Sequence, residues 1–167
     1  GEFWVASSWV ISKVDEIEKA ILQLKPDIVI VDGMYLLREY GGAKWEQMFN
    51  VSREIQRLGH KHKIPIVVTN QMSPDDKKKG KKGDSLNMKS GYGRSLIESS
   101  DVVLGLYRPP QVAASGRAIL RILYSRDGLS RTVQLKFDMF KMDFSEEREI
   151  TDMNALLSLL RSDFESE

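Results

Sequence analysis

Two short apolar runs, each preceded by a helix-like segment, constrain the fold of this chain more than any other feature. The first run is Ile28–Val31 and the second lies within 64–69, and in neither do polar and apolar residues alternate. Runs of this kind are typical of parallel strands that are covered on both faces. The order helix, strand, helix, strand therefore predicts an α/β architecture with a parallel sheet.

The segments before the two runs have the periodicity of amphipathic helices. The first helix is expected over 12–25, with Ser12 and Asp15 as capping residues and Pro26 ending it. Its apolar residues recur at spacings of three and four and share one face: Val14, Ile17, Ile21 and Leu24. The second helix is expected over 44–62.

Three further apolar segments follow in the second half of the chain. They are 101–107, 118–124 and 132–137. Because they are closely spaced, and because Asp127-Gly128 supplies turn chemistry between the last two, we expect antiparallel pairing at this end. A final helix is expected over 150–160, and a short strand near the start over 4–10.

Composition excludes several classes of protein. The chain has 167 residues, of which 41% are hydrophobic and 29% charged, and we expect one domain over 1–167. Its formal net charge of +1 means that any attraction for nucleic acid must be local. It has no cysteine for disulfides or thiolate metal sites, which fits a cytoplasmic protein. No apolar stretch approaches the roughly 20 residues of a membrane span, so we expect no membrane partner.

Polar residues close both buried runs and give the first indication of chemistry. Asp32 follows the first run and Gln71 follows the second. Parallel neighbouring strands end at one edge of a sheet, where ligands bind in open α/β folds, so both side chains are expected there. A carboxylate suits Mg²⁺, and an amide hydrogen-bonds a phosphate or an attacking water. The alternatives are that Asp32 caps the turn before Gly33 and that Gln71 makes a backbone contact.

A basic segment over 73–94 departs from the α/β pattern. Seven basic residues against three aspartates give it a local charge of +4, and its four glycines lead us to expect a flexible loop. Such a segment attracts phosphate backbones without reading sequence. The alternative is a solvated loop without a partner. The residues expected to contact DNA are Lys77, Lys78, Lys79, Lys81, Lys82, Lys89 and Arg94.

Arg126 is the remaining candidate. It leaves a predicted strand just before Asp127-Gly128, so it is expected to project from the edge of the domain. An arginine offered across a subunit boundary stabilises charge at the neighbour's phosphates. The alternative is a local ion pair with Asp127.

Five segments, in order and spacing over about 11–144, resemble the motor domain of DnaB-like replicative helicases, with the phage members fitting best. In chain order they are a Walker B strand followed by an aromatic-Leu pair (26–37), a helix and a strand ending in the sensor glutamine (52–58 and 64–72), a further block (97–104 with 107–108), the arginine-finger block (123–128) and a closing strand (135–137).

The resemblance implies a RecA-like core, with a mostly parallel central sheet flanked by helices and antiparallel strands at its C-terminal edge. It implies an ATP-dependent DNA helicase that forms a hexameric ring and moves along single-stranded DNA, in the host cytoplasm if phage-encoded. It places Asp32 on Mg²⁺, Gln71 as sensor of the ATP γ-phosphate, Arg126 as the finger for a neighbouring subunit, and 73–94 as a DNA-contacting loop. A primase or helicase loader is a further implied partner.

The sequence departs from the family in three places. It contains no Gly-x-x-x-x-Gly-Lys-Ser/Thr phosphate loop. Tyr124 stands where bacterial members carry lysine, and one residue is missing between Glu98 and Asp101. We therefore expect a C-terminal fragment whose phosphate loop and catalytic glutamate lie upstream, and which alone binds ATP poorly and hydrolyses none.

Two other functions remain open from the sequence. A RecA- or RadA-like recombinase or mediator shares the ATPase core but forms filaments and exchanges strands. A non-catalytic nucleic-acid-binding module keeps the α/β core and the basic segment, and an upstream sequence without a phosphate loop would favour it.

Overall fold

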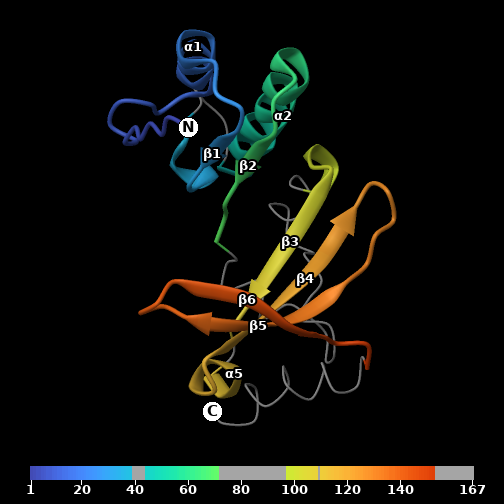
Figure 1. Cartoon of the computed structure of the whole chain (residues 1–167). Helices are drawn as coiled ribbons and strands as arrows, with labels where there is room; N and C mark the ends of the chain where they lie inside the picture. Colours follow the sequence, from blue (N-terminus) through green and yellow to red (C-terminus); the bar gives the residue numbers. More distant parts are fainter. Residues whose placement is uncertain (39–43, 72–96, 109, 153–167) are drawn as a thin grey trace. The chain divides into compact units, whose positions relative to one another are not determined.

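The computed structural model describes residues 1–38, 44–71, 97–108 and 110–152 (Figure 1). Among these, the residues up to Ser100 form one compact unit and those from Asp101 onward form another. The prediction of a single domain over 1–167 stays a prediction. None of the described helices is long and apolar enough to cross a membrane.

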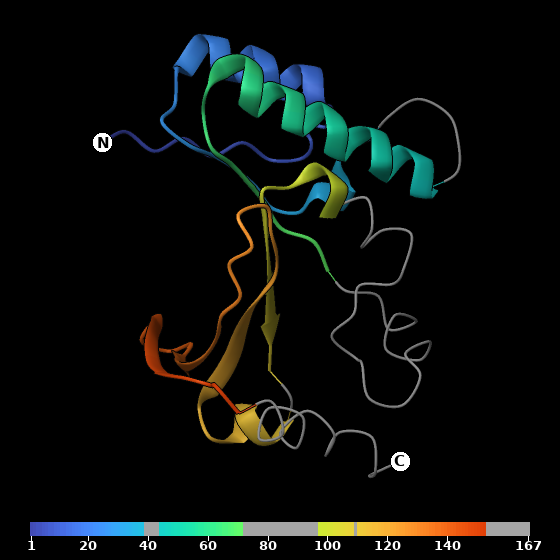
Figure 2. The same cartoon turned by 90° about the vertical axis from the view of Figure 1, so that its right-hand side faces the viewer.

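The first unit is built on a pair of parallel strands. Strand β1 (Val29–Val31) pairs in parallel with β2 (Ile66–Val68). Helix α1 (Val14–Leu24) precedes β1, the short 3-10 helix η1 (Met34–Leu36) follows it, and helix α2 (Lys44–His62) leads to β2. The two α-helices lie side by side (Figure 2). The predicted order of helix, strand, helix and strand is therefore confirmed.

The core of this unit joins both helices to one face of the strand pair. Val29, Val31, Ile66 and Val68 pack against the buried cluster. That cluster consists of Val14, Ile17, Ile21, Met34, Leu37, Met48, Val51, Ile55 and Leu58. The strands were predicted to be covered on both faces. The opposite face is not covered in this way, because Ile30 is 62% exposed among the described residues. The described helices cover a single face of this strand pair.

Helix α1 begins one residue later than its capping pattern indicates. Its N-cap is Lys13, and the carboxylate of Glu16 accepts hydrogen bonds from the backbone N–H groups of Ser12 (2.6 Å) and Lys13 (3.0 Å). The Ser12 N–H lowers the pKa of Glu16. The prediction that Asp15 fills this role is wrong: Asp15 pairs with Lys19 along the helix (3.6 Å). Glu16 is better placed because it occupies the third helical position.

The sequence also predicted one element near each end of the chain, a strand over 4–10 and a helix over 150–160. The segment 4–10 forms no strand: a turn closes there, with the N–H of Val10 donating to the carbonyl of Ser7 (2.9 Å). The helix expected over 150–160 lies mostly outside the described residues.

The second unit is an antiparallel sheet with strand order β3-β4-β5-β6. Strands β3 (Val102–Tyr107), β4 (Arg117–Ser125) and β5 (Thr132–Asp138) match three predicted segments. Helix α5 (Pro110–Ala114) and strand β6 (Asp143–Glu149) were not predicted. The described residues thus form a two-stranded parallel sheet and a four-stranded antiparallel sheet, so a mostly parallel central sheet is not confirmed.

In strand β3, neighbouring side chains occupy the space that a Cβ atom at Gly105 would need. A Cβ atom added to Gly105 would lie 2.6 Å from the Tyr107 hydroxyl oxygen and 2.9 Å from Leu123 Cδ1. Both distances are shorter than a van der Waals contact. The Tyr107 ring therefore occupies the volume that a side chain at position 105 would need.

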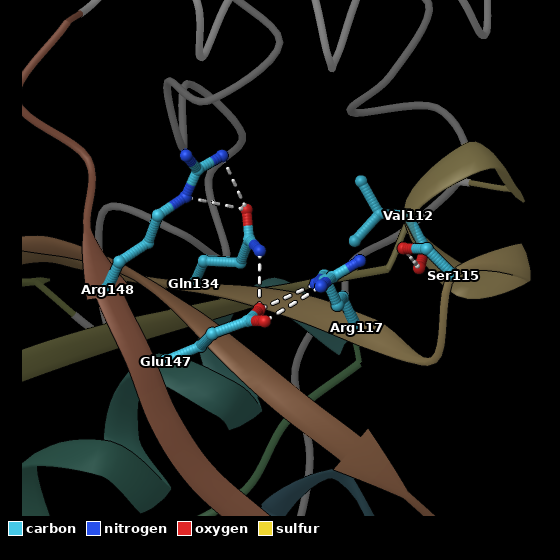
Figure 3. A network of polar contacts seen from close by, with 6 residues as sticks. All are labelled: Val112, Ser115, Arg117, Gln134, Glu147 and Arg148. Atoms are coloured by element: carbon cyan, nitrogen blue, oxygen red, sulfur yellow. Dashed lines mark hydrogen bonds and ion pairs between the residues drawn. The ribbon is translucent and has the colours of Figure 1, made fainter.

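A polar network fastens β6 to the sheet (Figure 3). Glu147 lies in a β-bulge, because Gln134 pairs with Arg148 while the next residue of β5 pairs with residue 146. Its carboxylate accepts two hydrogen bonds from Arg117 (2.6 and 2.7 Å) and one from Gln134 (2.6 Å). Arg148 in turn donates to the Gln134 side-chain oxygen (3.2 Å). Arg117 and then Gln134 lower the pKa of Glu147 from 4.5 to about 2.

The core of the first unit gives a prediction on stability. Ile21 is 5% exposed and belongs to the buried cluster, whereas Leu22, its neighbour on α1, is 60% exposed. Ile21→Ala should lower the free energy of unfolding by about 2–5 kcal/mol, because it leaves a cavity. Leu22→Ala, the matched control, should change it by less than about 1 kcal/mol. Urea denaturation measures both, and equal losses would contradict the packing described.

The Glu147 network gives a prediction on acid stability. Because the pKa of Glu147 is lowered on folding, its ion pair stabilises the protein above pH 4.5, and this contribution is lost as the pH falls toward about 2. Glu147→Gln should therefore lose less stability than the wild type on acidification through that range. Urea midpoints measured along the pH series test this. Glu149→Gln, on the same strand with a 3.4 Å pair to Arg131, is the control and should have a smaller effect.

Candidate functional site

The register of β1 and β2 brings two of the predicted residues to one sheet edge. Val31 pairs with Val68, so Asp32 and Thr69 are the next residues along each strand. The Thr69 N–H donates to the carbonyl of Val31 (3.0 Å) and extends the pairing. Gln71 follows two residues later and is exposed. Asp32 and Gln71 therefore leave the carboxyl ends of adjacent parallel strands.

The carboxylate of Asp32 has a partner that the sequence did not indicate. The hydroxyl of Thr69 donates a hydrogen bond to Asp32 Oδ1. This bond ties the two strand ends together and fixes the rotation of the carboxyl group, leaving Oδ2 without a described protein partner. The sequence alone did not identify Thr69 as the partner of Asp32, because the contact depends on the register of the two strands.

The turn after Asp32 is held by packing. Met34, which is 1% exposed, anchors η1 in the core, and its N–H donates to the carbonyl of Thr69 (2.9 Å). Gly33 is also buried. The predicted alternative, in which the Asp32 side chain caps this turn, is not what the described residues show, because its hydrogen bond goes to Thr69.

The donor set at this edge suits a hard divalent cation held by few protein groups. Asp32 is exposed, and its second carboxylate oxygen accepts no hydrogen bond from the described residues. Within 1–38, 44–71, 97–108 and 110–152, no cluster of three or more His, Cys, Asp or Glu side chains could hold a metal ion. A single carboxylate fits Mg²⁺, which keeps several waters and is commonly shared with substrate phosphates.

Arg126 lies at the end of β4 and pairs with a residue other than the expected one. Its Nη1 is 3.0 Å from Asp101 Oδ1, and its backbone N–H donates to the Asp101 carbonyl (2.8 Å). The alternative of an ion pair with Asp127 is therefore wrong. The Arg126 side chain is 50% exposed. An exposed guanidinium at a strand end is available to another molecule.

The basic segment lies outside the described residues. This applies to the predicted DNA contacts Lys77, Lys78, Lys79, Lys81, Lys82, Lys89 and Arg94. Their role stays a prediction from sequence.

Solved structures identify the class of fold. The chain matches a structure described as an ATPase domain with a TM-score of 0.70 and 21% identity, covering 82% of this chain and 52% of that one. It matches the structure titled "The Structure Of A DnaB-Like Replicative Helicase And Its Interactions With Primase" with the same TM-score, identity and coverage of this chain, but 35% of that one. The fold is that of helicase ATPase domains, and this chain spans about half or less of the matched chains.

The sequence then gives the family. Residues 7–146 match the model of the DnaB-like helicase C terminal domain. The chain belongs to this family, which confirms the resemblance based on five segments. No curated protein matches the sequence.

Proposed function

We propose that this chain is part of the motor domain of an ATP-dependent replicative DNA helicase that forms a hexameric ring and moves along single-stranded DNA. The observation that carries the proposal is the sheet edge where Asp32, held by Thr69, lies on the strand next to the one leading to Gln71. Ligands bind at the carboxyl ends of parallel strands in this class of fold. Membership of the DnaB-like family supports ATP as the ligand.

Each residue has a distinct role in the proposal. Asp32 would hold Mg²⁺ through Oδ2, the oxygen that Thr69 does not contact, while Thr69 keeps the carboxyl group oriented. Gln71 would donate its amide to the ATP γ-phosphate or orient the attacking water. Arg126 would reach the phosphates bound to a neighbouring subunit. Mg²⁺, when bound, neutralises charge that develops on the phosphates.

The proposal also names the binding partners of the chain and what ATP hydrolysis would require. The basic segment 73–94 would grip the backbone of single-stranded DNA. One matched structure is titled for its interactions with primase, and we propose a primase or a helicase loader as partner here, in the cytoplasm. Because the chain has no phosphate loop, hydrolysis would require residues from a longer protein, and this chain alone would be inactive.

The experiment that tests the function is unwinding of a forked DNA duplex by the full-length protein with ATP and Mg²⁺. Asp32→Asn should reduce unwinding and Mg²⁺-dependent hydrolysis by about 100-fold or more, because it removes the charge that holds the cation. Asp27→Asn is the matched control, since Asp27 is exposed near the opposite end of β1, and should retain activity.

Three results would contradict parts of the proposal. Full activity in Asp32→Asn would refute the role of this edge. DNA-stimulated hydrolysis without unwinding by the wild type would favour a recombinase. No hydrolysis by the wild type would leave a nucleic-acid-binding module.

The basic segment gives a separate prediction. Replacing Lys77, Lys78, Lys79, Lys81 and Lys82 with glutamine should weaken binding of single-stranded DNA by the full-length protein. The slope of log K against log salt should become shallower by up to about 3.5, or about 0.7 per lost phosphate contact. Lys19→Gln, on the exposed face of α1, is the control. An unchanged slope would show that these lysines do not contact phosphates.

A further inference from the structure

Asp101 and Arg126 face each other across one end of the β3–β4 ribbon. Val102 pairs with Ser125, and the next residues outward are Asp101 and Arg126. They contact each other twice, through the Arg126 N–H and the Asp101 carbonyl (2.8 Å) and through the side chains (3.0 Å). The backbone contact fixes where the arginine leaves the sheet, and the carboxylate fixes where its side chain goes.

The ion pair leaves most of the guanidinium available. Asp101 contacts Nη1 of Arg126, and within the described part of the chain Nε and Nη2 form no ion pair, so both can donate to a phosphate. The side chains of Arg126 and Asp101 are 50% and 68% exposed, so another molecule can approach the pair. Asp127, although adjacent in sequence, forms no ion pair with Arg126 among the described residues.

An exposed ion pair of this kind contributes little to the stability of a fold. Its physical effect is on the side chain itself. A free arginine samples many rotamers, and ordering it on binding has an entropic cost. A carboxylate that already selects one direction lowers that cost and brings the guanidinium closer to its productive geometry.

We propose that Asp101 is a positioning residue for Arg126, holding the guanidinium in the orientation in which it meets the phosphates of a neighbouring subunit. The inference rests on the finger role of Arg126 in the proposed function. It adds a residue that does not itself touch the nucleotide but sets the geometry of one that does.

The test is steady-state ATP hydrolysis by the full-length protein with single-stranded DNA. Asp101→Ala should lower kcat by about two- to fivefold, the scale of the orientational preference that an exposed ion pair supplies, with the KM for ATP changed by less than about twofold because Arg126 acts in the transition state. Asp101→Glu keeps the carboxylate and should restore part of the loss. Asp127→Ala removes the same charge one residue from Arg126 without breaking the pair, and should keep wild-type kcat.

The variants separate failure of the inference from failure of the proposed function. If Arg126→Ala hydrolyses ATP normally, the finger role itself is wrong. If Arg126→Ala is inactive while Asp101→Ala behaves like Asp127→Ala, Asp101 does not position the arginine. A lower kcat in Asp101→Ala with an equal loss in Asp101→Glu would also overturn the inference. Asp101→Asn keeps the size of the side chain but removes its charge. If the charge positions Arg126, Asp101→Asn should lower kcat as much as Asp101→Ala does.

Discussion

The parallel pairing of β1 and β2 is the constraint on which the candidate site depends. Each strand has three residues, so the pair has few hydrogen bonds of its own and is held by the helices that cover one face. Because Val31 lies opposite Val68, the carboxylate of Asp32 meets the hydroxyl of Thr69. A shift of one residue would turn every side chain of a strand to the other face and separate these groups.

The sequence predicted the elements whose signals are local. The helical spacing of Val14, Ile17 and Ile21 identified α1, and the uninterrupted runs identified β1 and β2. The edge that carries Asp32 and Gln71 also followed from the sequence, because parallel strands end on the same side. Arg126 was placed at a strand end for a different reason, because it precedes the Asp127-Gly128 turn signal, and its role there stays a prediction.

What the sequence missed depends on contacts between distant residues or on polar strands. Strand β6 reads Asp-Phe-Ser-Glu-Glu-Arg-Glu, which lacks an apolar pattern; it is held by pairing with β5 and by Glu147 contacting Arg117, 30 residues away. Asp101 could not be linked to Arg126 until the register of β3 and β4 was known. The exposure of Ile30 was likewise invisible, because an apolar run does not reveal which of its faces is covered.

The close approach of Tyr107 to Gly105 has a consequence for how the family can diverge. With a tyrosine at position 107, any side chain at position 105 meets its hydroxyl and Leu123. The two positions are therefore coupled through the space they share. A lineage that acquires alanine or a larger residue at 105 must also move or shorten the side chains at 107 and 123, so substitutions at 105 are expected to accompany changes at these two positions.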